Sequence, residues 1–132
     1  MTEYVVLLPG DEGAWESATE EERSETYARH GEFARLLGER GHKITGGSEL
    51  THSREAKLVR RGADGVVVTD GPYAETVEQL TGFYIVDTDD LDDLLEVVGV
   101  LAGAEEAIEV RPTVDHSSDH SSDSSGHSSD LA

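Results

Sequence analysis

Two side chains of this 132-residue chain, His30 and Asp70, have residue types and expected positions that suit proton-transfer chemistry. A carboxylate that accepts a hydrogen bond from one imidazole nitrogen fixes the tautomer and leaves the other nitrogen free as a general acid or base near neutral pH. We therefore predict His30 and Asp70 as a catalytic pair. The alternative is that His30 is a core histidine with satisfied hydrogen bonds and that Asp70 is a turn residue capping the backbone of Gly71.

Asp70 stands at the end of a predicted short, buried strand and opens a loop. Residues 66–69 are a β-branched run, after which Gly71 permits a turn and Pro72 removes a backbone donor. A second apolar run, 83–86, follows Gly82, so two strands are expected to hold the loop, and loops held in this way often carry binding groups. The further ligand-pocket candidates are Tyr73, Glu75 and Glu78 on this loop and Arg111 on the last predicted strand.

Arg111 could hold a carboxylate through two hydrogen bonds, either that of Glu75 or that of an acidic ligand. A purely structural ion pair with Glu75 is the alternative, because a long loop needs something to order it.

The elements expected to position these residues alternate between strands and helices. Strands are predicted over 4–8, 42–50, 56–61, 66–69, 83–87 and 107–111, and residues 11–17 are predicted to be a loop around Trp15. Thr19 and Glu22 form a capping box for a helix that ends at Gly41, and Tyr27, His30, Ala34 and Leu37 share its sheet-facing stripe. A second helix covers 91–101. This order predicts an α+β fold of the ferredoxin-like βαββαβ type with an extra hairpin strand.

The stretch from Val66 to Tyr84 resembles the DGPF signature of the YCII-related family. Within the signature Tyr73 replaces Phe, Val77 replaces Lys and Thr81 replaces Gly, and the similarity extends over residues 3–112. The resemblance implies a homodimeric α/β barrel made from two sheets that face each other. The matching residues are Asp70, Gly71, Pro72, Ala74, Glu75, Thr76, Glu78, Gln79, Leu80, Gly82, Phe83 and Tyr84.

Two functions follow from the candidate residues and the resemblance. The first is cofactor-free acid/base catalysis, an elimination or isomerisation of a small metabolite by His30 and Asp70; the resemblance includes a dehydrochlorinase, and the wider fold includes lactone isomerases. The second is a non-catalytic module that binds a ligand or partner in transcriptional regulation, because relatives are often encoded beside alternative sigma factors. Gly-rich phosphate loops, nucleophile elbows and paired metal-ligand spacings are absent from the sequence, so we predict no cofactor and no metal.

The composition is strongly acidic, with 29 Asp and Glu against 10 Lys and Arg and a formal net charge of -19. Molar salt screens such self-repulsion, so we predict a halophile's cytoplasmic protein. Clustered cations that would bind nucleic acid are missing, and no apolar run is long enough to span a membrane. An acidic surface that recruits a basic partner is the alternative explanation of the charge.

We divide the chain into a domain over residues 1–112 and an acidic tail over 113–132. Within the tail, residues 115–130 repeat Ser, His and Asp and have no apolar residue to bury, which predicts disorder. Its three histidines could also bind zinc, nickel or copper loosely, although a flexible tail supplies no fixed ligand geometry. His42 and His52 are expected on the surface.

Overall fold

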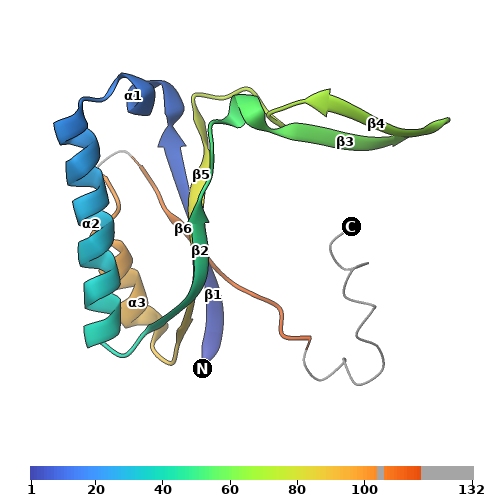
Figure 1. Cartoon of the computed structure of the whole chain (residues 1–132). Coiled ribbons are helices and arrows are strands. Elements are labelled where there is room, and N and C mark those ends of the chain that lie inside the picture. Colours follow the sequence, from blue (N-terminus) through green and yellow to red (C-terminus); the bar gives the residue numbers. More distant parts are fainter. Residues whose placement is uncertain (104–105, 117–132) are drawn as a thin grey trace.

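An antiparallel sheet with helices on one face forms the body of the molecule (Figure 1). The computed structural model describes residues 1–103 and 106–116, and in this part of the chain the main sheet has four strands in the order β2-β5-β1-β6. These strands are β1 (Thr2–Asp11), β2 (Lys43–Glu49), β5 (Glu78–Thr88) and β6 (Glu109–Pro112). The predicted α+β class is confirmed.

The helices α2 (Glu20–Glu39) and α3 (Leu91–Val98) cover the same face of the sheet (Figure 1). The predicted capping box of α2 is confirmed, since the Glu22 N–H donates to Thr19 Oγ1 over 3.1 Å and the Thr19 N–H donates to Glu22 Oε1 over 2.8 Å. The core lies between these helices and the sheet, where apolar side chains leave water together. Its buried members are Val6, Phe33, Leu37, Val86, Leu94, Val97 and Val98.

The predicted inward stripe of α2 is correct only in part. Leu37 is buried, whereas Ala34 is exposed and Tyr27 is 52% exposed. Phe33, expected only at the flank of the stripe, is fully buried. The first half of α2 lies over a hollow lined by Tyr27 and His30, so its side chains do not pack tightly on the sheet.

Residues 11–17 were predicted as a loop, but residues 12–17 form the short helix α1 (Glu12–Ser17). The carboxylate of Asp11 accepts from the Ala14 N–H at the helix start over 3.0 Å. The guanidinium of Arg23 donates to the carbonyl oxygens of Trp15 and Glu16 at the other end. Asp11 directly before the helix and Arg23, seven to eight residues beyond its last turn's carbonyl groups, therefore satisfy the two ends of α1.

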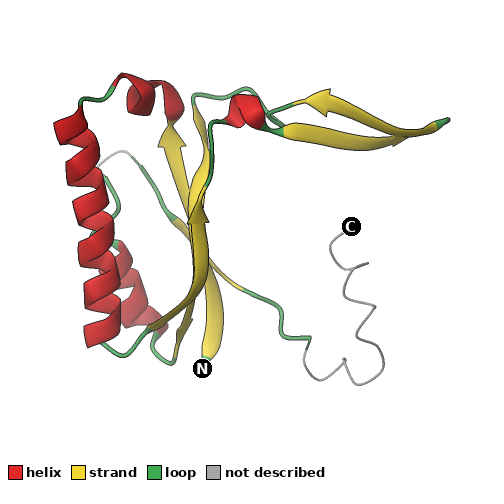
Figure 2. Ribbon diagram, in the orientation of Figure 1, coloured by secondary structure: helices red, strands yellow, loops and turns green. Residues whose placement is uncertain are grey.

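Two further strands, β3 (Lys57–Gly62) and β4 (Gly65–Asp70), form a separate two-stranded sheet, and the prediction that residues 66–69 are buried is wrong, because all of β4 is exposed. This hairpin arm, residues 57–70, projects from the body on the side of the sheet opposite the helices (Figures 1 and 2). A 3-10 turn, η1 (Ser53–Glu55), precedes it. Because β5 begins at Glu78, the loop after Asp70 is shorter than predicted and covers residues 71–77.

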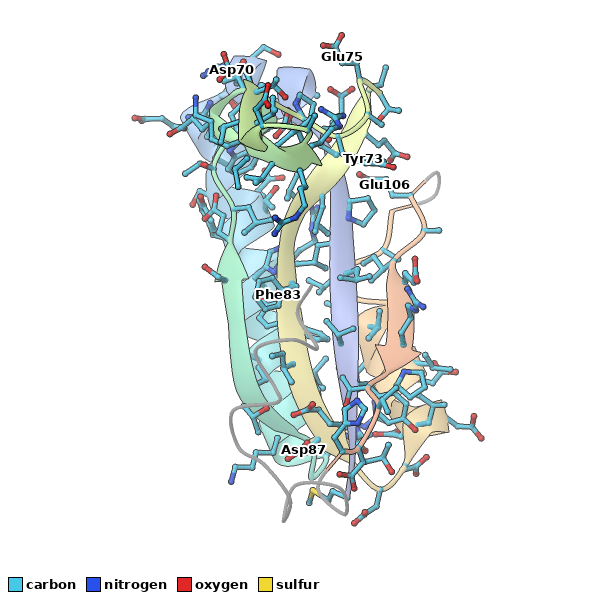
Figure 3. The ribbon with its side chains drawn as sticks, turned by 90° about the vertical axis from the view of Figure 1, so that its right-hand side faces the viewer. Asp70, Tyr73, Glu75, Phe83, Asp87 and Glu106 are labelled. Atoms are coloured by element: carbon cyan, nitrogen blue, oxygen red, sulfur yellow. The ribbon has the colours of Figure 1, made fainter. Side chains whose placement is uncertain are left out.

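The strand register separates the two faces of the main sheet. Tyr4 pairs with Val86 and Val6 with Tyr84, and these side chains face the helices. Because side chains alternate along a strand, the intervening pairs Val5–Ile85 and Leu7–Phe83 lie on the other face. We call this apolar patch (Val5, Leu7, Phe83 and Ile85) the open face; Figure 3 views it directly, with Phe83 near its centre.

The expectation that His42 lies on the surface is wrong, since its exposure is 5%. His42 Nδ1 lies 2.6 Å from Thr88 Oγ1, and Nε2 lies 2.7 Å from Asp93 Oδ2. Arg40 holds the other carboxylate oxygen of Asp93 at 3.0 Å. This network joins the end of α2, the end of β5 and the start of α3.

The net charge of -19 makes stability depend on salt. Raising potassium chloride from about 0.1 M to about 2 M should raise the melting temperature by more than roughly 10 °C, because the screening length falls from about 10 Å to below about 3 Å. Differential scanning calorimetry at constant pH measures the effect, with equal osmolality of sucrose as the uncharged control. A melting temperature that is flat in salt would contradict the predicted halophilic origin.

Candidate functional site

A groove opens between the helices and one end of the sheet. It encloses about 1150 Å³ and is bounded by α1, the first half of α2, the ends of β1 and β2, and the first half of β5. Its side chains include Trp15, Tyr27, His30, Tyr84 and Leu101. The volume is slightly above the range of about 300–1,000 Å³ for small-molecule sites, and the mixture of aromatic and polar side chains is typical of them.

His30 and Tyr84 meet inside this groove. His30 comes from α2, and Tyr84 comes from β5 on the side of the sheet that faces the helices. The His30 Nδ1 and Tyr84 Oη atoms lie 2.8 Å apart, which is hydrogen-bonding distance. The ring of Phe33 packs 5.0 Å from that of Tyr84, centroid to centroid, so the tyrosine is held by core packing as well as by its hydroxyl.

Both members of the pair are held in their neutral forms. Burial lowers the pKa of His30, and the nearby charge of Arg29 lowers it further, whereas Glu49 opposes this shift. Burial raises the pKa of Tyr84. Desolvation disfavours the charged form of each group, so the hydrogen bond joins a neutral imidazole to a neutral phenol.

Two proton arrangements satisfy this contact. In one, the Tyr84 hydroxyl donates to Nδ1. In the other, Nδ1–H donates to Tyr84 Oη, which leaves the Nε2 lone pair free as a base and the Tyr84 O–H free as a donor. The pair can therefore offer a base, His30 Nε2, and an acid, the Tyr84 O–H, from two side chains in contact.

Aromatic side chains form one wall of the groove. The rings of Trp15 and Tyr27 meet edge to face with centroids 5.6 Å apart, and the Tyr27 hydroxyl donates to the Glu49 carboxylate over 3.2 Å. The Arg23 guanidinium lies 5.2 Å from the Trp15 ring centroid. These contacts link α1, α2 and β2 and fix an apolar surface near His30.

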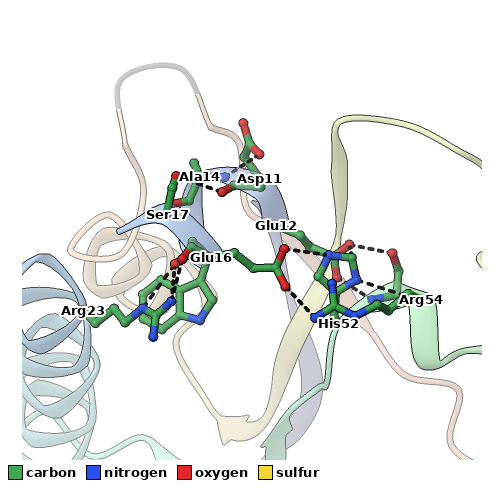
Figure 4. A network of polar contacts seen from close by, with 11 residues as sticks. Asp11, Glu12, Ala14, Glu16, Ser17, Arg23, His52 and Arg54 are labelled. Atoms are coloured by element: carbon green, nitrogen blue, oxygen red, sulfur yellow. Dashed lines mark hydrogen bonds and ion pairs between the residues drawn. The ribbon is translucent and has the colours of Figure 1, made fainter. Parts of the chain in front are cut away.

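A polar network fixes the mouth of the groove (Figure 4). Glu12 accepts hydrogen bonds from the N–H and hydroxyl of Ser53, over 2.7 and 2.5 Å. Arg54 pairs with Glu16 over 2.6 Å and lowers the pKa of that carboxyl group. His52 lies 3.7 Å from both Glu12 and Glu16, so α1 is tied to the turn that precedes the hairpin arm.

Within one chain the structure does not bring Asp70 to His30. Asp70 lies at the root of the arm, and its exposed carboxylate pairs with Lys57 Nζ over 2.6 Å. The hydrogen bond and charge of Lys57 lower the pKa of Asp70. His30 contacts Tyr84 instead because it faces the covered side of the sheet, whereas the arm leaves the opposite side.

The four other predicted ligand-pocket residues do not gather around His30 either. Tyr73 is 89% exposed on the loop after the arm. Glu75 lines a smaller hollow beside Gly71 and Pro72, and Glu78 begins β5. Arg111 pairs with Glu109 over 3.3 Å, so its predicted contact with Glu75 is replaced by a neighbour on the same strand.

Sequence reasoning identified His30 but missed its partner. The alternation of Phe83, Tyr84, Ile85 and Val86 did indicate that Tyr84 shares a face with Val86. The pairing itself depends on how α2 crosses β5. Among residues 1–103 and 106–116, no group of three or more His, Asp or Glu side chains is placed to hold a metal ion. His120 and His127 of the predicted loose metal site lie outside the described residues, as does most of the 113–132 tail.

These features define a small α+β protein with a polar and aromatic groove that contains a histidine–tyrosine pair. Residues 2–115 match the YCII-related domain, and the chain belongs to this family. It is 34% identical over 112 residues to the uncharacterized protein R00369 of Rhizobium meliloti (strain 1021), which covers 83% of this chain and 90% of the relative. Within the described part of the chain, no helix has the length and apolar character needed to cross a membrane.

Proposed function

We propose that the groove performs cofactor-free proton transfer on a small metabolite, an elimination or an isomerisation, with His30 as the acid/base group. The observation that carries this proposal is the 2.8 Å contact between His30 Nδ1 and Tyr84 Oη in a groove of about 1150 Å³. Because burial lowers the pKa of His30, the imidazole is unprotonated and ready to accept a proton at neutral pH.

The chemistry needs only these two side chains. In an elimination, His30 Nε2 takes a proton from carbon, a double bond forms, and the leaving group departs from the adjacent carbon with the bonding electron pair. In an isomerisation, the abstracted proton returns to a different atom of the substrate. Tyr84 fixes the imidazole through Nδ1 and can donate its O–H to developing negative charge.

The groove favours a neutral or cationic substrate with an apolar or aromatic part. Trp15 and Tyr27 supply the apolar wall. Carboxylates outnumber guanidinium groups among the lining residues, and the acids include Asp11, Glu22 and Glu106. An acidic ligand would meet like charge there, which lowers its affinity.

The His30–Asp70 mechanism remains a second form of this proposal, in which the carboxylate comes from another copy of the chain. Two conservative variants separate the forms. Tyr84→Phe should lower kcat about tenfold or more while Asp70→Asn has little effect, because the described contact of His30 is to Tyr84. A thermal-shift screen of neutral and cationic metabolites in molar salt supplies the substrate, and steady-state kinetics compares the variants.

A loss confined to Asp70→Asn would overturn the histidine–tyrosine form and favour the carboxylate. Full activity in both variants and in a His30 variant would contradict acid/base catalysis in the groove altogether. Binding without chemical change would instead favour the second candidate, a ligand- or partner-binding module linked to transcriptional regulation. The aromatic wall formed by Trp15 and Tyr27 supports binding in either case.

We also propose that the protein is a ferredoxin-like homodimer whose two open faces pack together as an α/β barrel. The strand order β2-β5-β1-β6, with the arm inserted between β2 and β5, supports the ferredoxin-like arrangement. The apolar pairs Val5–Ile85 and Leu7–Phe83 support a covered face, since such patches mark interaction sites. We also propose that the protein is located in the cytoplasm, as predicted from the sequence.

Phe83→Asp should convert this dimer to a monomer, because two carboxylates related by symmetry would be buried near the centre of the interface. Sedimentation-velocity ultracentrifugation in about 2 M potassium chloride, which keeps charge repulsion screened, measures the change. Leu95→Asp is the matched control. Leu95 is 45% exposed on α3, which covers the side of the sheet opposite the open face. A wild-type protein that sediments as a monomer would exclude the dimer.

A further inference from the structure

One face of the hairpin arm carries a row of valines. The register pairs Val59 with Val68 and Arg61 with Val66, so these side chains share a face with the Lys57–Asp70 pair at the root. We call Val59, Val66 and Val68 the valine face; their exposed fractions are 65%, 64% and 57%. The opposite face carries Arg60 and Val67, which form the intervening cross-strand pair.

An arm of this kind needs a surface to pack against. A two-stranded ribbon alone is only marginally stable in water, because neither face is buried. Every residue of β4 is exposed, and in β3 only Leu58 is partly covered. Three adjacent exposed valines on a ribbon therefore indicate a surface that is covered in the assembled protein.

The charge of the arm identifies the kind of surface that covers it. Residues 57–70 contain three of the chain's ten Lys and Arg residues but only two of its 29 acids, which gives the arm a formal net charge of +1. The whole chain carries -19. The arm is thus the cationic segment of an acidic protein, and a second copy of the same chain is a partner of complementary charge.

The direction of the arm points to the same partner. It leaves the body on the side of the open face, opposite α2 and α3 (Figure 1). A second copy seated on the open face would lie alongside the arm, and by two-fold symmetry its own arm would lie alongside the first copy. The two contacts would be continuous with each other.

We propose that the valine face of the arm is an intersubunit contact, packed against the body of a second copy of this chain. The contact deepens the dimer proposed above and rests on it. It also reaches the groove, because the turn η1 at the root of the arm carries Ser53 and Arg54, which bind Glu12 and Glu16 at the groove mouth. Docking of the arm would hold that mouth in one position.

The test compares the same chemical change on the two faces of the arm. Val59→Thr/Val68→Thr removes apolar surface from the valine face, and Val67→Thr makes the same change on the other face; threonine keeps a high strand propensity. Sedimentation equilibrium of the full chain in about 2 M potassium chloride gives the dimer dissociation constant. We expect it to rise about tenfold or more for the double variant and to remain near the wild-type value for Val67→Thr.

Two results would overturn the inference. Wild-type dissociation constants in both arm variants, while Phe83→Asp yields monomers, would leave the open-face dimer intact and remove the arm from it. Equal weakening by the double variant and by Val67→Thr, measured per substitution, would show a general effect on the hairpin. If Phe83→Asp leaves the dimer intact but the double variant weakens it, the arm contact stands and the open-face dimer fails. Circular dichroism checks that every variant keeps its strand content.

Discussion

Replacing His30 with glutamine is expected to lower kcat of the proton-transfer reaction by about 10²- to 10⁴-fold, the contribution typical of a positioned acid/base group. Glutamine retains a side-chain amide that can hydrogen-bond to the Tyr84 hydroxyl, which lies 2.8 Å from Nδ1 in the native protein. It cannot accept a proton near neutral pH. The melting temperature should therefore change little, whereas kcat falls.

The pH profile gives this prediction a second readout. A general base must be unprotonated, so kcat/KM should rise with pH through the pKa of His30 and then level off. Burial lowers that pKa, so the midpoint of the rise should lie below pH 6.5, the ordinary value for imidazole. This rise should disappear in the residual activity of His30→Gln.

The same shift affects stability with a definite sign. The folded-state pKa of His30 is depressed, so the unfolded chain binds more protons between that pKa and about 6.5. The contribution of His30 to the free energy of unfolding is therefore fully present above about pH 6.5, and it decreases as the pH falls through this window. His30→Gln should remove this part of the pH dependence from the melting curve.

Arg35→Gln provides the matched control for the kinetic experiment. Arg35 lies on the same helix and pairs with Glu32 and Glu39 on its exposed side. Its replacement should leave kcat unchanged, because surface ion pairs contribute little to the stability of the fold. Full turnover by His30→Gln on the identified substrate would exclude His30 as the acid/base group.

Replacing His42 with alanine is expected to lower the free energy of unfolding by about 3 kcal/mol, the second large effect. His42 is 5% exposed, and its two ring nitrogens contact Thr88 and Asp93. Removal of the ring leaves the Thr88 hydroxyl and one Asp93 oxygen with fewer partners and opens a cavity. The affected elements are the end of α2, β5 and the start of α3.

Guanidinium chloride cannot be used at constant ionic strength here, so urea unfolding in about 2 M potassium chloride is the appropriate measurement. His52→Ala is the matched control, because His52 is one-quarter exposed in its side chain and lies 3.7 Å from its two carboxylates. Loss of the His52 side chain should lower the free energy of unfolding by less than about 1 kcal/mol. Equal effects of the two substitutions would contradict a structural role specific to His42.

The local sequence pattern determined the elements that depend on nearby residues. The capping box at Thr19 and Glu22 located the start of α2, and Gly41, with a φ of 83°, marked its end. The apolar run over residues 4–8 located β1, and the β-branched run over residues 66–69 located β4. These features depend on backbone geometry and on contacts within a few residues, which a sequence pattern reports directly.

The sequence motif around Asp70 also indicated the family correctly, since residues 2–115 match the YCII-related domain. It did not determine which residues share the groove. His30 and Tyr84 are 54 positions apart, and His42 and Asp93 are 51 apart. No local period relates such positions, so their contacts could not be predicted from either segment alone.

The tertiary structure alone decided which side of the sheet each functional group reaches. The hairpin insertion carries Asp70 away on the uncovered side, whereas the crossing of α2 over β5 places His30 against Tyr84 on the covered side. The sequence by itself determined the α+β elements, the acidic character and the presence of His30 on an inward helix face. The partner of His30 was decided by packing between distant elements, because hydrogen bonds form between atoms that are close in space, whatever their separation along the chain.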